Sequence, residues 1–162
     1  MRWLATLLVL ILVPAAGRAD CVDPPGPGVD WTRCYFDGRS FQDVNLAGAR
    51  MRDATFSRGD LSRAVMVEVS ASRAKFISAT LHEADFADAT LREADFTNAD
   101  LTDASMVRAD LTRARLFRAN LRGADLTGAR MRGADLLDAD LSGALWIDGK
   151  YRCAEGSIGQ CR

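Results

Sequence analysis

A five-residue repeat runs without interruption from Ala79 to Leu145, and it limits the possible folds of this 162-residue chain more than any other feature. Each repeat has a large apolar residue at its centre, called position i below, and alanine at position i−2. The other three positions are mostly polar. The centres are Leu81, Phe86, Leu91, Phe96, Leu101, Met106, Leu111, Leu116, Leu121, Leu126, Met131, Leu136 and Leu141.

The period of five is incompatible with a regular helix or a straight strand. An α-helix rotates by about 100° per residue, so steps of five would scatter the apolar side chains around its surface. In a straight strand, an odd step would send successive centres to opposite faces of the sheet. A chain that bends at every repeat keeps all centres pointing at one axis. The period therefore predicts a β-solenoid, in which short strands stack coil upon coil.

The order of residue types within each repeat is more specific than the period. Alanine is followed often by Asp or Asn, then by Leu or Phe, then often by Ser, Thr or Arg, and then often by Gly. This order resembles the pentapeptide-repeat family, and it can be traced from Phe36 to Trp146. The resemblance implies an all-β fold, a right-handed quadrilateral β-helix with four repeats per coil. Positions i and i−2 would lie inside, and about 20 residues per coil give about five to six coils.

The chain divides into four segments. Residues 1–19 are expected to be a secretory signal peptide, with Arg2, an apolar run from Leu4 to Val13 and small residues before a cut after Ala19. Residues 20–35 form a Pro/Gly-rich lead-in and cap, residues 36–146 the solenoid, and residues 147–162 a C-terminal cap in which Asp148 and Gly149 make a turn. The mature protein is thus expected in the periplasm or secreted, with no membrane span after cleavage.

Four cysteines flank the solenoid, two on each side. An even number in an exported chain favours disulfides, and a metal site is the alternative. With four repeats per coil the rod would be about 25 Å long, and bridged Cα atoms lie within about 7 Å. We therefore expect Cys21 to pair with Cys34, and Cys153 with Cys161. Together with Trp31 and Trp146, which would act as apolar lids, these ends are expected to prevent end-to-end polymerisation.

One stretch, Val65 to Ser72, departs from the repeat. Its centre is the small Ala71, while Val69 occupies the corner position where alanine is usual. A local exchange of volume between the two positions would preserve the coil. A loop or bulge at this point is the alternative.

The sequence offers no set of residues typical of an enzyme. His82 is the only histidine, and it lies at the outward position i+1. Asp85, Asp95, Asp100, Asp110, Asp125, Asp135 and Asp140 all lie at position i−1. Acid–base catalysis needs carboxylates in a cleft that separates their pKa values, and a convex rod provides none; solubility and hydrogen bonds to turns explain these residues better. We therefore expect no enzymatic activity, no cofactor and no metal.

The outward positions suggest an interaction surface instead. With four repeats per coil, one side carries more arginines than Asp53, Glu93 and Asp110 can balance, and the opposite side is mainly acidic, with Asp43, Asp60, Glu83, Asp100, Asp103 and Asp140. Such a two-sided rod could steer a charged partner. The candidate contact residues are the arginines Arg50, Arg52, Arg73, Arg92, Arg113, Arg130 and Arg132, and the outward apolar residues Ile77, Phe117 and Leu137.

The leading functional hypothesis is a non-enzymatic, exported scaffold or protein-interaction module that binds a protein partner or a second copy of itself. The alternative, implied by the resemblance, is a DNA mimic, because some members of the family resemble duplex DNA and bind DNA gyrase. Export would remove this chain from gyrase, and its arginine-bearing side departs from the negative surface of DNA. We therefore expect no nucleic-acid partner.

Overall fold

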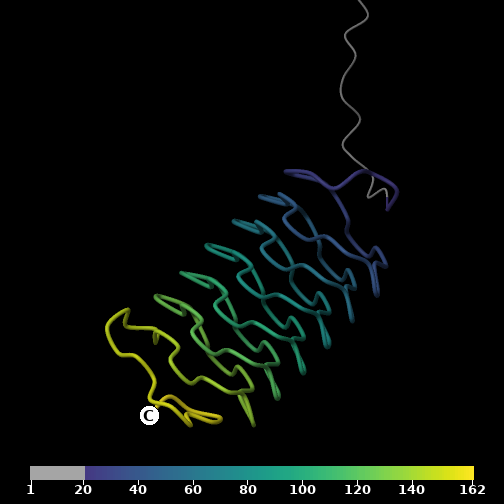
Figure 1. Cartoon of the computed structure of the whole chain (residues 1–162). Coiled ribbons are helices and arrows are strands. Elements are labelled where there is room, and N and C mark those ends of the chain that lie inside the picture. Colours follow the sequence, from purple (N-terminus) through teal and green to yellow (C-terminus); the bar gives the residue numbers. More distant parts are fainter. Residues whose placement is uncertain (1–20) are drawn as a thin grey trace, which may run out of the picture.

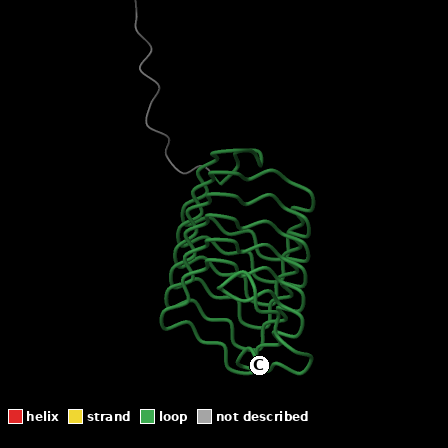
Figure 2. Cartoon of the chain, turned by 90° about the vertical axis from the view of Figure 1, so that its left-hand side faces the viewer, coloured by secondary structure: helices red, strands yellow, loops and turns green. Residues whose placement is uncertain are grey.

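The structure is a computed structural model that describes residues 21–162, and these residues form a stack of closely similar coils (Figure 1). None of the described residues lies in a helix or in a multi-residue strand. Isolated parallel bridges join the coils, so all described residues are drawn as loop in Figure 2. The expected signal peptide, residues 1–19, lies outside the described residues. Within residues 21–162 no helix has the length and apolar character that crossing a membrane would require.

The register of the bridges confirms four repeats per coil. The parallel bridges join residues twenty apart, from Asp30 with Arg50 to Asp125 with Leu145. At each centre the backbone N–H points to the next coil, as where Phe76 N donates to Asp95 O at 2.7 Å. The return bond is equally regular, because Asp95 N donates to Ala74 O at 2.9 Å. Each side of the rod is thus a narrow parallel ladder.

A tight turn after each centre makes the chain bend. The carbonyl of the centre accepts a hydrogen bond from the N–H three residues later, as from Ala94 N to Leu91 O at 3.1 Å. Position i+2 has a positive φ, 58° at Glu93 and 70° at Gly123. This is the pattern of a type II turn, which explains the frequent glycine at that position. Non-glycine residues such as Glu93 adopt the same conformation at a cost of about 1–2 kcal/mol each.

The aspartates at position i−1 hold these turns. In each of the seven singled out in the sequence, Oδ1 accepts a hydrogen bond from the backbone N–H two residues later. At Asp100 the partner is Thr102 N, at 3.1 Å. A short carboxylate that caps a turn in this way stabilises it locally. The expectation of hydrogen bonds to turn backbone is therefore confirmed.

The interior is filled by the centres and the corner alanines, which are almost all fully buried. One inward column stacks phenylalanines directly, with 5.4 Å between the ring centroids of Phe56 and Phe76 and 5.0 Å between those of Phe76 and Phe96. Phe86 packs edge-on against Phe76 at 5.9 Å from the neighbouring side. Offset and edge-on contacts of this kind add to the burial of the rings.

The stretch from Val65 to Ser72 keeps the regular coil. Val69 and Ala71 are both 0% exposed, and Ser70 is bridged to Arg50 and to Thr90 like its counterparts in other coils. The only local sign of the exchange is a longer turn hydrogen bond, 3.4 Å from Val69 N to Met66 O. The expected exchange of volume is confirmed, and the alternative of a bulge was wrong.

The N-terminal end is closed by an aromatic lid. Trp31 is 1% exposed, and its ring centroid lies 4.4 Å from that of Phe36 and 5.2 Å from that of Phe41. The Trp31 indole N–H donates to Asp23 O at 3.3 Å, and the Cys21–Cys34 disulfide ties the lead-in segment to the first coil. The lid expected from Trp31 is confirmed.

The C-terminal end is closed over only two of its four sides. After a turn at Asp148 and Gly149 the chain runs back across the last coil, and antiparallel bridges join Leu145 with Arg152 and Asp140 with Ile158. The Cys153–Cys161 disulfide holds this cap, with Cys153 only 2% exposed. Residues 130–138 have no cap segment paired above them. The chain reverses direction before it reaches those two sides. The expectation that the two ends prevent end-to-end polymerisation stays a prediction.

Both predicted disulfides are present. The Cα atoms of Cys21 and Cys34 are 5.4 Å apart, and those of Cys153 and Cys161 are 4.9 Å apart. No cysteine of the described residues is free. The alternative of a cysteine metal site was therefore wrong.

Candidate functional site

The arginines selected from the sequence lie on one side of the rod, which we call the basic side: the centres Trp31, Met51, Ala71, Leu91, Leu111 and Met131 with the outward residues that flank them. All seven are solvent-exposed. The structure thus brings together Arg50, Arg52, Arg73, Arg92, Arg113, Arg130 and Arg132 as a strip that runs along the length of the rod.

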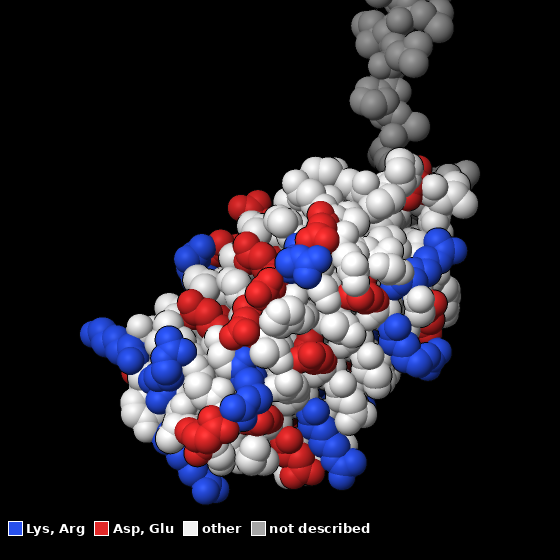
Figure 3. Space-filling view, viewed as in Figure 1, with Lys and Arg blue, Asp and Glu red and all other residues white. Residues whose placement is uncertain are grey.

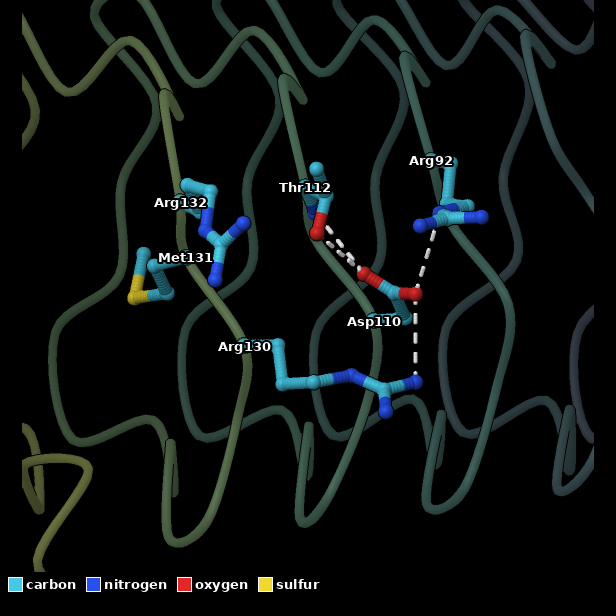
Figure 4. A pocket seen from close by; sticks show the side chains of 6 residues that line it. All are labelled: Arg92, Asp110, Thr112, Arg130, Met131 and Arg132. Carbon is cyan, nitrogen blue, oxygen red and sulfur yellow. Dashed lines mark hydrogen bonds and ion pairs between the residues drawn. The ribbon is translucent and has the colours of Figure 1, made fainter.

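Asp110 is the anchor at the C-terminal part of the basic side (Figure 4). Its side chain is only 8% exposed, and Oδ2 contacts Arg92 Nε and Arg130 Nη2, each at 3.1 Å. Oδ1 accepts hydrogen bonds from the Thr112 hydroxyl at 2.6 Å and from Thr112 N at 3.1 Å. Burial by itself would raise the pKa of Asp110, but the bonds from Thr112 and the two arginines outweigh it and lower the pKa. Asp110 is therefore a fixed anion that orients Arg92 and Arg130.

Other arginines of the basic side differ in how far their charge is neutralised. Arg73 makes a two-pronged contact with Asp53, 2.7 Å from Nε to Oδ1, and Arg50 Nη2 lies 3.0 Å from Asp30 Oδ2. The hydrogen bond from Arg73 is the main reason why the pKa of Asp53 is lowered. Among residues 21–162, Arg113 and Arg132 have no acidic side chain within ion-pair distance, so they remain available to a partner.

Open depressions lie between the arginines. One, of about 540 Å³, is lined by Arg92, Asp110, Thr112, Arg130, Met131 and Arg132. A second of about 500 Å³ adjoins it and adds Glu93, Arg113 and Gly133. A third of about 270 Å³ lies nearer the N-terminus, between Arg52, Arg73 and Arg92. A fourth reaches Lys75 and Arg115 on the adjacent side. The sequence pattern did not single out Lys75 and Arg115, although their positions at i−1 beside the basic side could have indicated them.

The opposite side, centred on Phe41, Leu61, Leu81, Leu101, Leu121 and Leu141, is the acidic side. Arg63 and Arg122 are its arginines, and both are paired: Arg63 Nε lies 2.6 Å from Asp43 Oδ1, and Arg122 contacts Asp140 at 3.2 Å and Glu155 at 2.8 Å. His82 Nδ1 lies 3.1 Å from Thr102 O. Figure 3, which shows one face of the molecule, has acidic and basic side chains interspersed. Each side thus carries both positive and negative side chains. The two sides differ in which charge is in excess.

The three outward apolar candidates lie on a third side, between the basic and acidic sides. Leu137 is 61% exposed, whereas Ile77 and Phe117 are half-buried. The guanidinium of Arg118 lies over the Phe117 ring, 4.7 Å from its centroid, which gives this outward aromatic a structural contact that the sequence did not reveal. Phe117 and Ile77 therefore offer less apolar surface than their outward position suggested, and Leu137 offers the most.

The chemistry available on this surface is binding. Among residues 21–162, every aspartate whose pKa is clearly displaced has it lowered. A hydrogen bond from Thr32 lowers the pKa of Asp30, and a hydrogen bond from Arg108 lowers that of Asp88. A general acid needs the opposite displacement. Within the described residues, no group of three or more His, Cys, Asp or Glu side chains is arranged to hold a metal ion.

Comparisons with known proteins agree with the fold. The family model of the pentapeptide repeat region matches residues 39–116, and that of pentapeptide repeats in eight copies matches residues 109–145. No match was found among curated protein sequences.

Several solved structures are similar. HetL, a pentapeptide repeat protein involved in heterocyst differentiation regulation from the cyanobacterium Nostoc sp. strain PCC 7120, is 31% identical with a TM-score of 0.58. The match covers 77% of this chain and 65% of HetL. QnrB1, a plasmid-mediated fluoroquinolone resistance protein, is 25% identical with a TM-score of 0.46, over 73% of this chain and 70% of QnrB1. Rfr23 from the cyanobacterium Cyanothece 51142 is 22% identical with a TM-score of 0.41, and the match covers 72% of this chain and 90% of Rfr23.

The stacked twenty-residue coils, the two family matches and the similarity to HetL lead to one conclusion. This chain belongs to the pentapeptide-repeat family, whose members form right-handed quadrilateral β-helices.

Proposed function

We propose that this protein is a non-enzymatic, exported interaction module, a rod of about five to six coils whose basic side binds an acidic surface of a partner protein. The observation that carries the proposal is the strip of seven exposed arginines, of which Arg113 and Arg132 have no acidic partner among residues 21–162. A narrow, fully packed core fixes the spacing of these arginines. A rigid array of side chains with the same sign of charge steers and orients a partner of the opposite charge.

Export is supported by the two disulfides, because disulfides persist in oxidising compartments such as the periplasm. The expected signal peptide at residues 1–19 is consistent with this and stays a prediction. Cleavage after Ala19 would make Asp20 the first residue and Cys21, which is paired with Cys34, the second. Mass spectrometry of the protein recovered from the periplasm of a bacterial host would give the mature N-terminus directly.

The charge distribution is the reason for preferring an acidic protein partner to gyrase as a partner. Duplex DNA carries a negative charge on all sides at close intervals. The exposed arginines Arg52, Arg92 and Arg132, spaced along the basic side, interrupt such a negative field on that side. A DNA mimic would also need access to a cytoplasmic enzyme, which export removes.

Binding of an acidic polymer tests the proposed function. The mature protein would be titrated with fluorescently labelled poly-L-glutamate of defined length, with anisotropy as the readout. We expect binding that weakens as salt rises, because exposed charges are screened. The Arg113→Glu variant should bind markedly less.

Arg58→Glu is the matched control. Arg58 is exposed, lies at the same turn position as Arg113 with φ of 57° against 59°, and belongs to a different side of the rod. Both substitutions change the net charge equally, so a difference between them reports the location of the charge. Equal loss in both variants would show that only net charge matters and would contradict a binding role for the basic side.

A further inference from the structure

We propose that the uncapped strand edge at Arg130 to Ala134 accepts an extended acidic segment of the partner protein as an added β-strand. The inference rests on the proposed function, since it specifies how an acidic partner would engage the C-terminal end of the basic side. It concerns a part of the molecule where backbone groups, an apolar centre and arginines converge.

The backbone of this edge lacks the partners that every earlier coil has. One coil before it, Leu111 N donates to Arg130 O and Arg113 N donates to Arg132 O, each at 2.9 Å. The equivalent donors on the last coil, Met131 N and Gly133 N, have no acceptor among residues 21–162, and Ala129 O has no donor. An exposed edge with this spacing is a template for another strand.

The cap leaves a step that is one strand deep. It pairs with the coil at Leu145 and Asp140, and Gly159 of the cap lies close to the Leu136 carbonyl. No cap residue is hydrogen-bonded to the backbone around Met131. Met131 and Leu136 are only partly buried, whereas Leu111 and Leu116, their counterparts one coil earlier, are 0% exposed. A strand laid on the edge at the usual spacing of about 4.8 Å would restore the missing layer and cover Met131.

The charge expected of the incoming strand follows from the ion pairs between adjacent coils of the rod. Seven ion pairs among the described residues join an arginine to an aspartate exactly one coil away, as Asp53 with Arg73 and Asp110 with Arg130. In six of these pairs the aspartate lies on the preceding coil, and in one, Arg118 with Asp138, it lies on the following coil. The residue one coil before Arg132 is Thr112, and no coil follows Arg132, so it has no such carboxylate on either side. Arg132 also borders the depression that contains Arg92 and Arg130 (Figure 4). A carboxylate on the added strand would occupy the place one coil after Arg132.

A second copy of this chain fits the edge less well than a segment of a partner. Two rods placed end to end would meet first through their caps, each of which rises one strand layer above the coil, and this would hold the two open edges about 10 Å apart. Direct pairing of one basic edge with the same edge of another copy would also bring Arg130 and Arg132 against their own counterparts, and like charges repel.

The test uses the mature protein and a labelled eight-residue peptide of alternating glutamate and valine, acetylated at its N-terminus. Two further peptides carry N-methyl groups, one on all the glutamate nitrogens and the other on all the valine nitrogens. N-methylation removes the donors along one edge of the strand and keeps the charge. Met131 N and Gly133 N would donate to carbonyls of the added strand, and Ala129 O would accept from one of its N–H groups. N-methylation removes that last bond, and the methyl group blocks close approach of the strand. Since one backbone hydrogen bond contributes about 0.5–1.5 kcal/mol, we expect one methylated peptide to bind about two- to ten-fold more weakly than the parent.

Variants separate the edge from the rest of the basic side. Arg132→Glu should weaken the parent peptide about ten-fold, since a charge-assisted contact is replaced by repulsion. Arg33→Glu is the control, because Arg33 is exposed on the same side at the opposite end of the rod and should leave peptide binding unchanged. Light scattering on the protein alone measures self-association.

The outcomes distinguish this inference from the proposed function. Equal binding of all three peptides, with poly-L-glutamate binding retained, would overturn strand addition and leave the basic side as a charge-only surface. A stable dimer of the protein alone, abolished by Arg132→Glu and unaffected by peptide, would assign the edge to a second copy and would also overturn the inference.

Discussion

The two ends of the rod terminate the same repeat in different ways. At the N-terminal end Trp31, Phe36 and Phe41 are 1%, 2% and 8% exposed, so the first coil is sealed by aromatic rings. At the C-terminal end Leu137 and Tyr151 are 61% and 50% exposed, and Met131, Leu136 and Trp146 are only partly buried. One end is closed by side chains, and the other is half closed by a returning backbone.

This difference shows that a solenoid can be stabilised without pairing all of its terminal backbone. An aromatic lid excludes water from the core and requires few additional residues. A returning strand satisfies backbone groups, but only on the sides that it reaches. In this chain one of the sides that remain open is the basic side, so the reversal that ends the fold also leaves the proposed binding edge exposed.

The largest expected difference between the ends concerns their tryptophans. Trp31→Ala should lower the free energy of unfolding by about 3–5 kcal/mol, because it empties a buried site at the end of the aromatic stack. Trp146→Ala should cost clearly less, since Trp146 is only partly buried. Urea denaturation followed by far-ultraviolet circular dichroism measures both. Equal losses would mean that the two ends contribute alike.

Removing the disulfides should have the next largest effect. Replacing both cysteines of either pair by alanine removes a link between residues 13 or 8 positions apart, which should cost about 2–3 kcal/mol in the loop-entropy account. Only loss of Cys153–Cys161 should also free the cap and enlarge the open edge. Hydrogen exchange at Leu141 N and Trp146 N, which now donate to the cap, should accelerate in that variant alone. Protection that stays unchanged there would show that the cap does not need its disulfide.

Corner alanines provide a matched pair within one column. Ala114→Leu should cost about 1–3 kcal/mol, because Ala114 is 0% exposed and the interior has no room for three more carbons. Ala134→Leu, one coil later at the open edge, should cost much less, since Ala134 is half-buried and the added atoms can extend past the end. Thermal unfolding of both variants checks this. A similar loss in the two would indicate that the edge is as tightly packed as the middle.

The smallest expected effect is that of acid. The pKa of Asp30 is lowered by its hydrogen bond from Thr32, and that of Asp140 is lowered by Ser142 and Arg122 despite partial burial. Both folded pKa values lie below the unfolded value near 3.9, so their contribution is complete above that pH and is lost as the pH falls through the folded pKa. Unfolding free energies measured from pH 7 to pH 2.5 should therefore decline only below about pH 4.

Asparagine variants assign that decline to one end or the other. Asp140→Asn acts at the cap, and Asp30→Asn acts next to Trp31 at the other end. Each should flatten part of the acid dependence. Stability that rises as the pH is lowered from 5 to 3 would contradict the direction of these pKa changes.

Much of the fold could be predicted because the position of a residue within the repeat indicates whether its side chain points into the core or outward. The period placed Leu91 and Ala94 inside, and the resemblance supplied the four-sided coil that put Asp53 beneath Arg73. The disulfide pairing followed because a rod separates its ends. The site was predicted only as a set of arginines on one side. Which of them are neutralised, as Arg92 is by Asp110, depends on side-chain directions that spacing alone does not give.

The sequence by itself determined the register, the core and the charged sides. The strict period of five, together with the four repeats per coil that the family resemblance implies, gives every position a fixed direction. Tertiary structure alone decided how the rod ends. The path of the cap after Gly149 depends on a competition between continuing the coil and pairing backward, which no periodic signal encodes. That reversal covers Leu141 and Trp146 and leaves the edge from Arg130 to Ala134 open. The physical reason is that each repeat is suited to pair with a similar repeat on the next coil. No coil follows the last one, so the repeat does not specify what covers it.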